Sequence, residues 1–225
     1  MQDPVDDIVF SKRLKTYDGS ITLFDRTSQY IRIPPPDLNS SIATGKDLLT
    51  TQGATYLLTD RMKKSIKKHD KDPVYALKVY MELFGLDYSL KFIDKVLKES
   101  AVLIGNQKNK YNRARPSQLA PYFGVDLSTL PSRTNKSPSY PSGHSAQARL
   151  LAEIYAEKYP IHKDNLLKAA EECGYGRVMA GFHFPTDHKY GAYLGKRLFK
   201  ALKGRKEPKL INYNKVFDLK QRNRS

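Results

Sequence analysis

The sequence predicts an all-α fold, a helical bundle preceded by a short extended N-terminal arm. From about residue 45 onward, apolar residues recur at three- and four-residue intervals through long stretches, which is typical of amphipathic helices. Strand-prone pieces are confined to the first 35 residues, and no internal repeat stands out. Because helices with few accompanying strands must bury their apolar stripes against one another, these observations favour a bundle.

The N-terminal arm is expected to be extended or to form a hairpin. Residues 8–10, 20–24 and 29–33 are short and rich in β-branched and aromatic side chains, which favours strand-like backbone. The run Pro34-Pro35-Pro36 then predicts a stiff polyproline turn before the helices begin.

The helical part shows start and stop signals in order. Residues 47–68 predict one or two helices, with Gly53 as a weak point. Asp72 suits an N-cap and Pro73 a first helical position, so a helix is expected from there to the stop at Gly85. A further helix is expected over 87–104, ending before Gly105, and others follow over 142–159, 163–180 and 185–202.

Two features of this helical part bear on packing and function. Gly191 and Gly195 lie one turn apart in the last predicted helix, so that face should approach a neighbour closely. The segment 116–141 lacks strong periodicity, and loops of that length in small domains are often functional.

We expect the 225 residues to form a single domain, with an arm at 1–44, a helical core at 45–202 and a basic tail at 203–225. Lys and Arg number 39 against 23 Asp and Glu, which gives a formal net charge of +16. Such a field attracts phosphorylated small molecules, anionic lipid surfaces or nucleic acid, although both the tail and the basic run 61–68 could equally be solvated surface.

The composition also excludes several classes. No stretch approaches the roughly 18–20 apolar residues of a spanning helix, which argues against an integral membrane protein. Cys173 is the only cysteine, so an internal disulfide or a cysteine metal cluster is excluded. The acidic opening residues lack the pattern of a signal peptide, and we expect a cytoplasmic protein or one peripheral to a membrane.

Three short segments carry the residues suited to chemistry. They span residues 108–116, 141–144 and 177–187, and we call them the first, second and third motifs. The second of them, Pro141-Ser142-Gly143-His144, opens a predicted helix, where free backbone N–H groups suit a phosphate oxygen. Gly143 permits close backbone approach, and His144 could exchange a proton near neutral pH.

The first and third segments supply cations and a second histidine. Lys108 and Arg115 lie in the first segment, and Arg177 begins the third; their donors suit oxyanions. In the third segment Asp187 follows His183 by four residues, so its carboxylate can orient the imidazole and leave the opposite nitrogen nucleophilic.

Each segment alone has an ordinary structural interpretation: a solvated basic turn, a helix cap, or a structural histidine–aspartate pair. Together they offer the groups that one oxyanion pocket needs. Three cations, helix-end amides, a nucleophilic histidine and a second, acidic histidine predict phosphoryl transfer without a metal.

In order and spacing, the three segments resemble the signature of the type 2 phosphatidic acid phosphatase superfamily. They read Lys108-x6-Arg115-Pro116, then Pro-Ser-Gly-His, then Arg177-x5-His183-x3-Asp187. That superfamily includes soluble bacterial acid phosphatases and vanadium haloperoxidases. The resemblance implies a helical core of that type and a phosphohistidine intermediate. It also implies that His183 is the nucleophile, Asp187 its orienter and His144 the acid for the leaving oxygen.

The resemblance assigns the remaining motif residues to the phosphate oxygens, namely Lys108, Arg115, Ser142, Gly143 and Arg177. It implies no cofactor and no metal, with vanadate acting as an inhibitor or phosphate mimic. The family often has serine before the third-segment arginine; this chain has Gly176, so we expect one hydroxyl contact to be missing.

The leading hypothesis is a metal-independent phosphatase for phosphate monoesters, with lipid phosphates and diphosphates as further candidates. The alternatives are a vanadate-dependent haloperoxidase using the same pocket, and a basic anion- or nucleic-acid-binding protein. We expect a small phosphorylated or lipid phosphate partner, an anionic membrane surface as a candidate partner of the basic tail, and no specific nucleic acid. The oligomeric state and the physiological substrate stay open.

Overall fold

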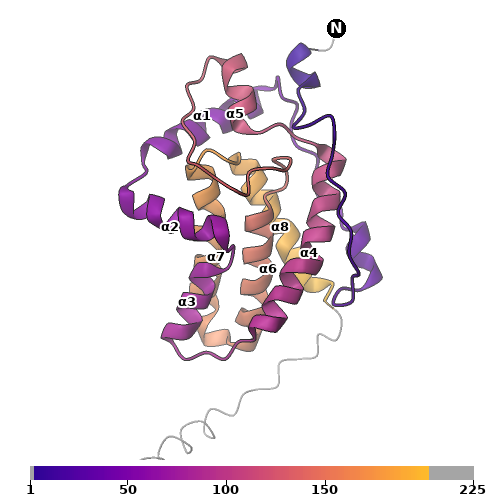
Figure 1. Cartoon of the computed structure of the whole chain (residues 1–225), viewed down its shortest axis with the longest axis vertical. Helices are drawn as coiled ribbons and strands as arrows, with labels where there is room; N and C mark the ends of the chain where they lie inside the picture. The colour runs from indigo at the N-terminus through magenta and orange to yellow at the C-terminus, as the bar shows by residue number, and fades with distance from the viewer. Residues whose placement is uncertain (1–2, 203–225) are drawn as a thin grey trace, which may run out of the picture.

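The computed structural model describes residues 3–202, and the basic tail expected at 203–225 lies outside them. Within the described residues the chain is helical and contains no strand longer than an isolated bridge. Helix α6 lies at the centre and packs against α7, α8 and α4 (Figure 1). The helices are α1 (Ile42–Tyr56), α2 (Asp60–Lys71), α3 (Tyr75–Leu83), α4 (Leu90–Tyr111), α5 (Pro116–Leu119), α6 (Gly143–Lys158), α7 (Lys163–Met179) and α8 (Pro185–Lys200). The all-α prediction is confirmed.

The N-terminal arm is extended apart from two short 3-10 helices, Pro4–Asp7 and Arg26–Tyr30, and the hairpin alternative is not found within the described residues. Its two isolated bridges join it to the helical part and not to itself: Val9 pairs with Arg113, and Phe24 pairs with Leu202. Phe24, Ile31 and Ile33 are buried in the main core, so these residues attach the arm to the helices. The arm runs along the outer side of α4 (Figure 1).

Three helix boundaries differ from the predictions. Gly53 lies inside α1, which ends only at Tyr56. Helix α3 begins at Tyr75, later than predicted, because Asp72 accepts hydrogen bonds from the Val74 and Tyr75 amides and forms a turn instead of an N-cap.

The third difference is the end of α4, which determines where the first motif lies. Helix α4 continues through Gly105 to Tyr111 and ends at Asn112, whose φ of 44° is left-handed. Gly105 does not stop the helix, because its missing side chain makes room for the Tyr17 ring: a Cβ there would lie 2.2 Å from Tyr17 Cγ. Lys108 therefore projects from the last turn of a long helix and not from a loop.

The predicted close approach of the last helix is found between α8 and α6. A Cβ on Gly191 would lie 2.5 Å from the Ser142 carbonyl oxygen, and one on Gly195 would lie 2.3 Å from the Ala146 carbonyl oxygen. The contact brings the beginnings of the two helices together, where the Ser142 amide donates to the Asp187 carbonyl at 3.0 Å. This packing positions the second and third motifs beside each other.

A pair of glycine substitutions tests this packing. We expect Gly195→Ala to lower the free energy of unfolding by about 1–3 kcal/mol, because the added methyl meets a backbone oxygen that no rotamer change can move. Gly53→Ala, at an exposed helical position with no atom within 4 Å, should instead raise it by about 0.5–1 kcal/mol. Urea denaturation of both variants measures the contrast, and equal effects would contradict the close approach.

No helix within residues 3–202 is both long enough and apolar enough to cross a bilayer.

Candidate active site

The first motif supplies two buried cations. Lys108 is 6% exposed and donates from Nζ to the Pro138 carbonyl at 2.5 Å. Arg115 is 3% exposed, and its guanidinium donates to the Ser137 carbonyl at 2.6 and 2.9 Å and to the Phe182 carbonyl at 2.8 Å. The segment 137–139 of the long loop thus lies directly against both cations.

Burial and mutual repulsion make these cations receptive to an anion. Burial lowers the pKa of Lys108 well below its usual value, and neighbouring Arg115 lowers it further. Burial likewise lowers the pKa of Arg115 to about 9, only partly opposed by Asp187. A bound oxyanion would reverse both effects, since an opposite charge nearby favours the protonated forms.

The third motif holds His183 in one tautomer. Its Nδ1 lies 3.3 Å from Asp187 Oδ2, and its Nε2 lies 3.2 Å from an Arg115 guanidinium nitrogen. A guanidinium only donates hydrogen bonds, so Nε2 must accept and the ring proton must be on Nδ1, facing the carboxylate. Burial, and then Arg115, lower the pKa of His183 well below its usual value. The neutral ring thus presents the lone pair of Nε2 to the cations.

Asp187 is fully buried and has partners that the sequence motif did not indicate. Arg113 donates to Oδ1 at 2.7 Å and to the Thr186 hydroxyl at 2.8 Å. The Ser139 hydroxyl and the Phe184 amide donate to Oδ2. Burial alone would raise the pKa of Asp187, but Arg113, His183 and Ser139 outweigh it and hold that pKa well below its usual range. The carboxylate therefore stays ionised and fixed in position.

The second motif forms the beginning of α6. Ser142 is its N-cap, and the following Gly143 and His144 provide first-turn amides. A Cβ on Gly143 would lie 3.7 Å from Lys108 Cε, so this helix end adjoins the first motif.

His144 lies near the cations of both other motifs. Burial lowers its pKa to about 3, and Arg177 and Lys108 act in the same direction. Lys108 also lowers the pKa of His183, so one ammonium group acts on both imidazoles. Nε2 of His144 is buried and has no hydrogen-bond partner within residues 3–202.

Arg177 is held by a residue that lies far from it in the sequence. Its guanidinium donates to Asp70 Oδ1 at 2.6 Å and to the Thr134 hydroxyl at 3.0 Å, and it stacks 4.4 Å from the Phe182 ring centroid. Burial would raise the pKa of Asp70, but hydrogen bonds from Thr134, Ser132 and Arg177 hold it well below its usual range. Helix α2 thereby fixes the third cation of the site.

Gly176, at the position where the resemblance suggests a serine, packs against the same helix. A Cβ there would lie 3.2 Å from Ile66 Cγ1 on the buried face of α2. A larger residue would therefore push α2 away from α7, which gives a packing reason for glycine.

The N-terminal arm reaches the rim of this site. Tyr17 is half-buried; burial raises its pKa, while a hydrogen bond with the Ser137 side chain and nearby Arg115 oppose the shift. The Arg115 guanidinium also lies 5.9 Å from the Phe10 ring centroid, and the Asn112 side chain donates to the Ser11 carbonyl. The arm thus contacts the first motif from outside.

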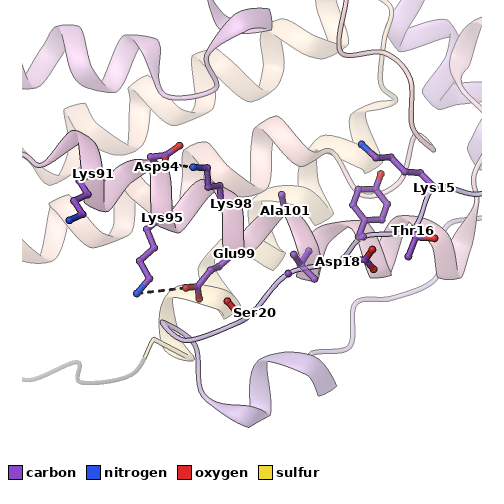
Figure 2. A pocket seen from close by; sticks show the side chains of 13 residues that line it. Lys15, Thr16, Asp18, Ser20, Lys91, Asp94, Lys95, Lys98, Glu99 and Ala101 are labelled. Atoms are coloured by element: carbon purple, nitrogen blue, oxygen red, sulfur yellow. Dashed lines mark ion pairs between the residues drawn. The ribbon is translucent and has the colours of Figure 1, made fainter.

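A groove of about 730 Å³ lies between residues 15–20 of the arm and α4, and neither imidazole lines it. Figure 2 shows lysines spread along it, with ion pairs joining Lys98 to Asp94 and Lys95 to Glu99. Its lining balances four lysines against three carboxylates, so its charge selects no particular ligand.

The eight motif residues therefore lie at or directly beside the ends of helices α4 to α8. Arg115, His183 and Asp187 form one connected cluster. Lys108 is close enough to Arg115, Asp187 and Arg177 for their charges to act on it, while Arg177 and His144 lie near Asp70. Their catalytic roles stay predictions. Sequence reasoning missed four residues that contact the motif residues, namely Arg113, Ser139, Asp70 and Thr134. The only available signal was closeness in sequence, since Arg113 and Ser139 lie two residues before Arg115 and Pro141.

The two imidazoles of the site, those of His144 and His183, make stability depend on pH. Unfolded histidines take up protons near pH 6.5, whereas the lowered folded pKa values of His144 and His183 delay uptake. The unfolded state then binds more protons below pH 6.5, so the free energy of unfolding should fall by up to about 1.4 kcal/mol per pH unit for each histidine. Urea denaturation between pH 7.5 and 5.5 measures this, and His144→Gln should flatten the slope. A pH-independent stability would contradict buried neutral rings.

Comparison with known proteins finds similarity over the region that carries these motifs. The family model described as the PAP2 superfamily matches residues 96–203, which include all eight motif residues. A non-specific acid phosphatase of Providencia stuartii is 27% identical over 164 residues, covering 68% of this chain and 65% of that protein. An acid phosphatase of Zymomonas mobilis is 30% identical over 138 residues, covering 60% of this chain and 50% of that protein. The chain therefore spans less than two thirds of the length of these curated relatives.

A solved structure shares the fold. The transmembrane PAP2-type phosphatidylglycerolphosphate phosphatase of Bacillus subtilis superposes with a TM-score of 0.50 at 21% identity, covering 80% of this chain and 89% of that one. Over residues 96–203 the chain is thus similar to the PAP2 superfamily, and the solved structure shows that it has a fold of that kind.

Proposed function

We propose that the chain is a metal-independent phosphatase that hydrolyses phosphate monoesters through a phosphohistidine formed on His183. The convergence of three buried cations with two neutral imidazoles supports this most strongly. Similarity to the PAP2 superfamily model over residues 96–203 and to two acid phosphatases supports the same reaction class.

In the first step, the lone pair of His183 Nε2 attacks phosphorus and the ester P–O bond breaks. Asp187 holds the Nδ1 proton and stabilises the charge that develops on the ring. Lys108, Arg115 and Arg177, with the Ser142 and Gly143 end of α6, neutralise the phosphate oxygens. The departing oxygen takes a proton from His144, whose pKa rises when the dianionic phosphate lies beside it.

In the second step, His144 accepts a proton from water and the water oxygen attacks phosphorus. The P–N bond breaks, which releases inorganic phosphate and restores the neutral His183 ring. The cations supply the charge neutralisation that metal ions supply in two-metal phosphatases, so the proposed reaction needs no cofactor. Vanadate, which adopts a similar geometry to the transferring phosphoryl group, should bind there as an inhibitor.

A turnover screen over phosphate monoesters, diphosphates and lipid phosphates, with metals chelated, tests this proposal. We expect hydrolysis to survive chelation and vanadate to inhibit competitively. Loss of all turnover on chelation would contradict it, and bromide oxidation by peroxide after vanadate loading would favour a haloperoxidase instead.

We infer the binding partners of the chain from its net charge. The net charge of +16 supports small phosphorylated substrates and lipid phosphates, and attraction of the basic tail to an anionic membrane surface. A cytoplasmic or membrane-peripheral location is part of the same proposal. Vesicle sedimentation of the full chain, with and without residues from Lys203 onward, tests the tail.

A further inference from the structure

A pocket of about 210 Å³ lies between α2 and the long loop, beside the candidate active site. Its walls are mainly apolar, from Ile66 of α2, Leu130 and Pro131 of the loop, and Phe182. Lys63 and Lys67 also line it, and their aliphatic stems extend the apolar surface while the ammonium groups reach water. A pocket with this lining suits an apolar group attached to an anion.

Two of its lining residues contact the cations that would hold phosphate. Asp70 accepts from Arg177 at 2.6 Å. Phe182 stacks on the same guanidinium, accepts a hydrogen bond from Arg115 with its carbonyl oxygen, and directly precedes His183. The pocket is therefore separated from the phosphate-binding groups by single side chains.

The pocket also adjoins the proposed acid. Attacking and leaving atoms are roughly in line at phosphorus, so an alcohol displaced by His183 would depart toward the acid that protonates it. Burial lowers the pKa of His144, the proposed acid, and Asp70, which lines the pocket, is close enough to oppose that shift. Its buried Nε2 has no partner within the described residues.

We propose that this pocket receives the organic group of the leaving alcohol, so that the chain prefers phosphate esters of aromatic or branched aliphatic alcohols over esters of polyols. The inference rests on the proposed function, because the leaving side is defined by attack from His183. A polyol placed there would lose its water contacts against apolar walls, whereas a branched alkyl group would gain burial.

The test compares 3-methylbutyl phosphate with glycerol 1-phosphate. Glycerol is the more acidic leaving alcohol, so leaving-group acidity alone would favour the glycerol ester. We expect kcat/KM for the branched ester to be at least about tenfold higher. Leu130→Asn, which makes one wall polar, and Leu130→Trp, which fills the pocket with an apolar ring, should both reduce this preference about tenfold. Leu127→Asn is the matched control, because Leu127 is a half-buried leucine of the same loop that packs in a different cluster.

Binding of two non-hydrolysable analogues, 3-methylbutylphosphonate and 2,3-dihydroxypropylphosphonate, is measured in parallel by calorimetry. Preferential binding of the branched phosphonate without any turnover would contradict the proposed function but support the pocket. Turnover with equal kcat/KM for the two esters would overturn the pocket while leaving the function. A preference that both Leu130 variants leave unchanged, or that Leu127→Asn reduces equally, would also overturn it.

Discussion

His183→Ala is expected to reduce kcat for p-nitrophenyl phosphate by at least about 10⁴-fold, because it removes the nitrogen that forms the covalent intermediate. The ring is 2% exposed, and both of its nitrogens are engaged by site residues, so no neighbouring histidine can replace it. The measurement is release of p-nitrophenol at saturating substrate.

The control for this substitution is His162→Ala. His162 lies outside the site, where its ring contacts the Tyr80 hydroxyl at 2.9 Å, so its loss should leave turnover within about twofold. Circular dichroism of both variants checks that the fold is retained. Unchanged turnover in a folded His183→Ala variant would reject this residue as the nucleophile.

Arg113→Ala is expected to lower the free energy of unfolding by about 3–5 kcal/mol, because it leaves the Asp187 carboxylate buried without its cation. Both side chains are almost completely inaccessible, at 1% and 0% exposure, and their nitrogen and oxygen lie 2.7 Å apart. Urea denaturation at neutral pH measures the change.

An ion pair that is less buried provides the matched control for Arg113. Arg149 and Glu153 also lie 2.7 Å apart, but their side chains are 27% and 12% exposed, and Arg149→Ala should cost about 1 kcal/mol or less. Adding Asp187→Asn to Arg113→Ala should recover part of the lost stability, since the unpaired charge is then gone. If both arginine variants lost the same stability, the buried pair would not be the cause.

The helices and the eight motif residues could be predicted because their signals are local. Apolar spacing fixes which face of a helix is buried, and the order of Lys108, Arg115, the α6 cap and the third motif is readable along the chain. The glycine spacing at Gly191 and Gly195 even indicated the close contact that α8 makes with α6.

The residues that support the motif could not be predicted, because their partners are distant in sequence. Asp70 lies 107 positions from Arg177, and nothing around it distinguishes it from other helix-end acids. The predicted end of α4 was wrong for a similar reason. Glycine is typical of a helix stop, but at Gly105 the Tyr17 ring from the arm occupies the space that a side chain would fill. Tertiary packing, which local patterns do not contain, decides both cases.

The most direct test of the covalent mechanism is to trap the phosphoenzyme. His144→Ala should slow attack by water more than release of p-nitrophenol, which leaves readily without an acid, so the intermediate should accumulate. Quenching in alkali, where phosphohistidine survives, followed by peptide mass spectrometry, should locate one phosphoryl group on His183, and adding His183→Ala should abolish it. A phosphoryl group on any other residue, or continued turnover with none, would contradict attack by His183.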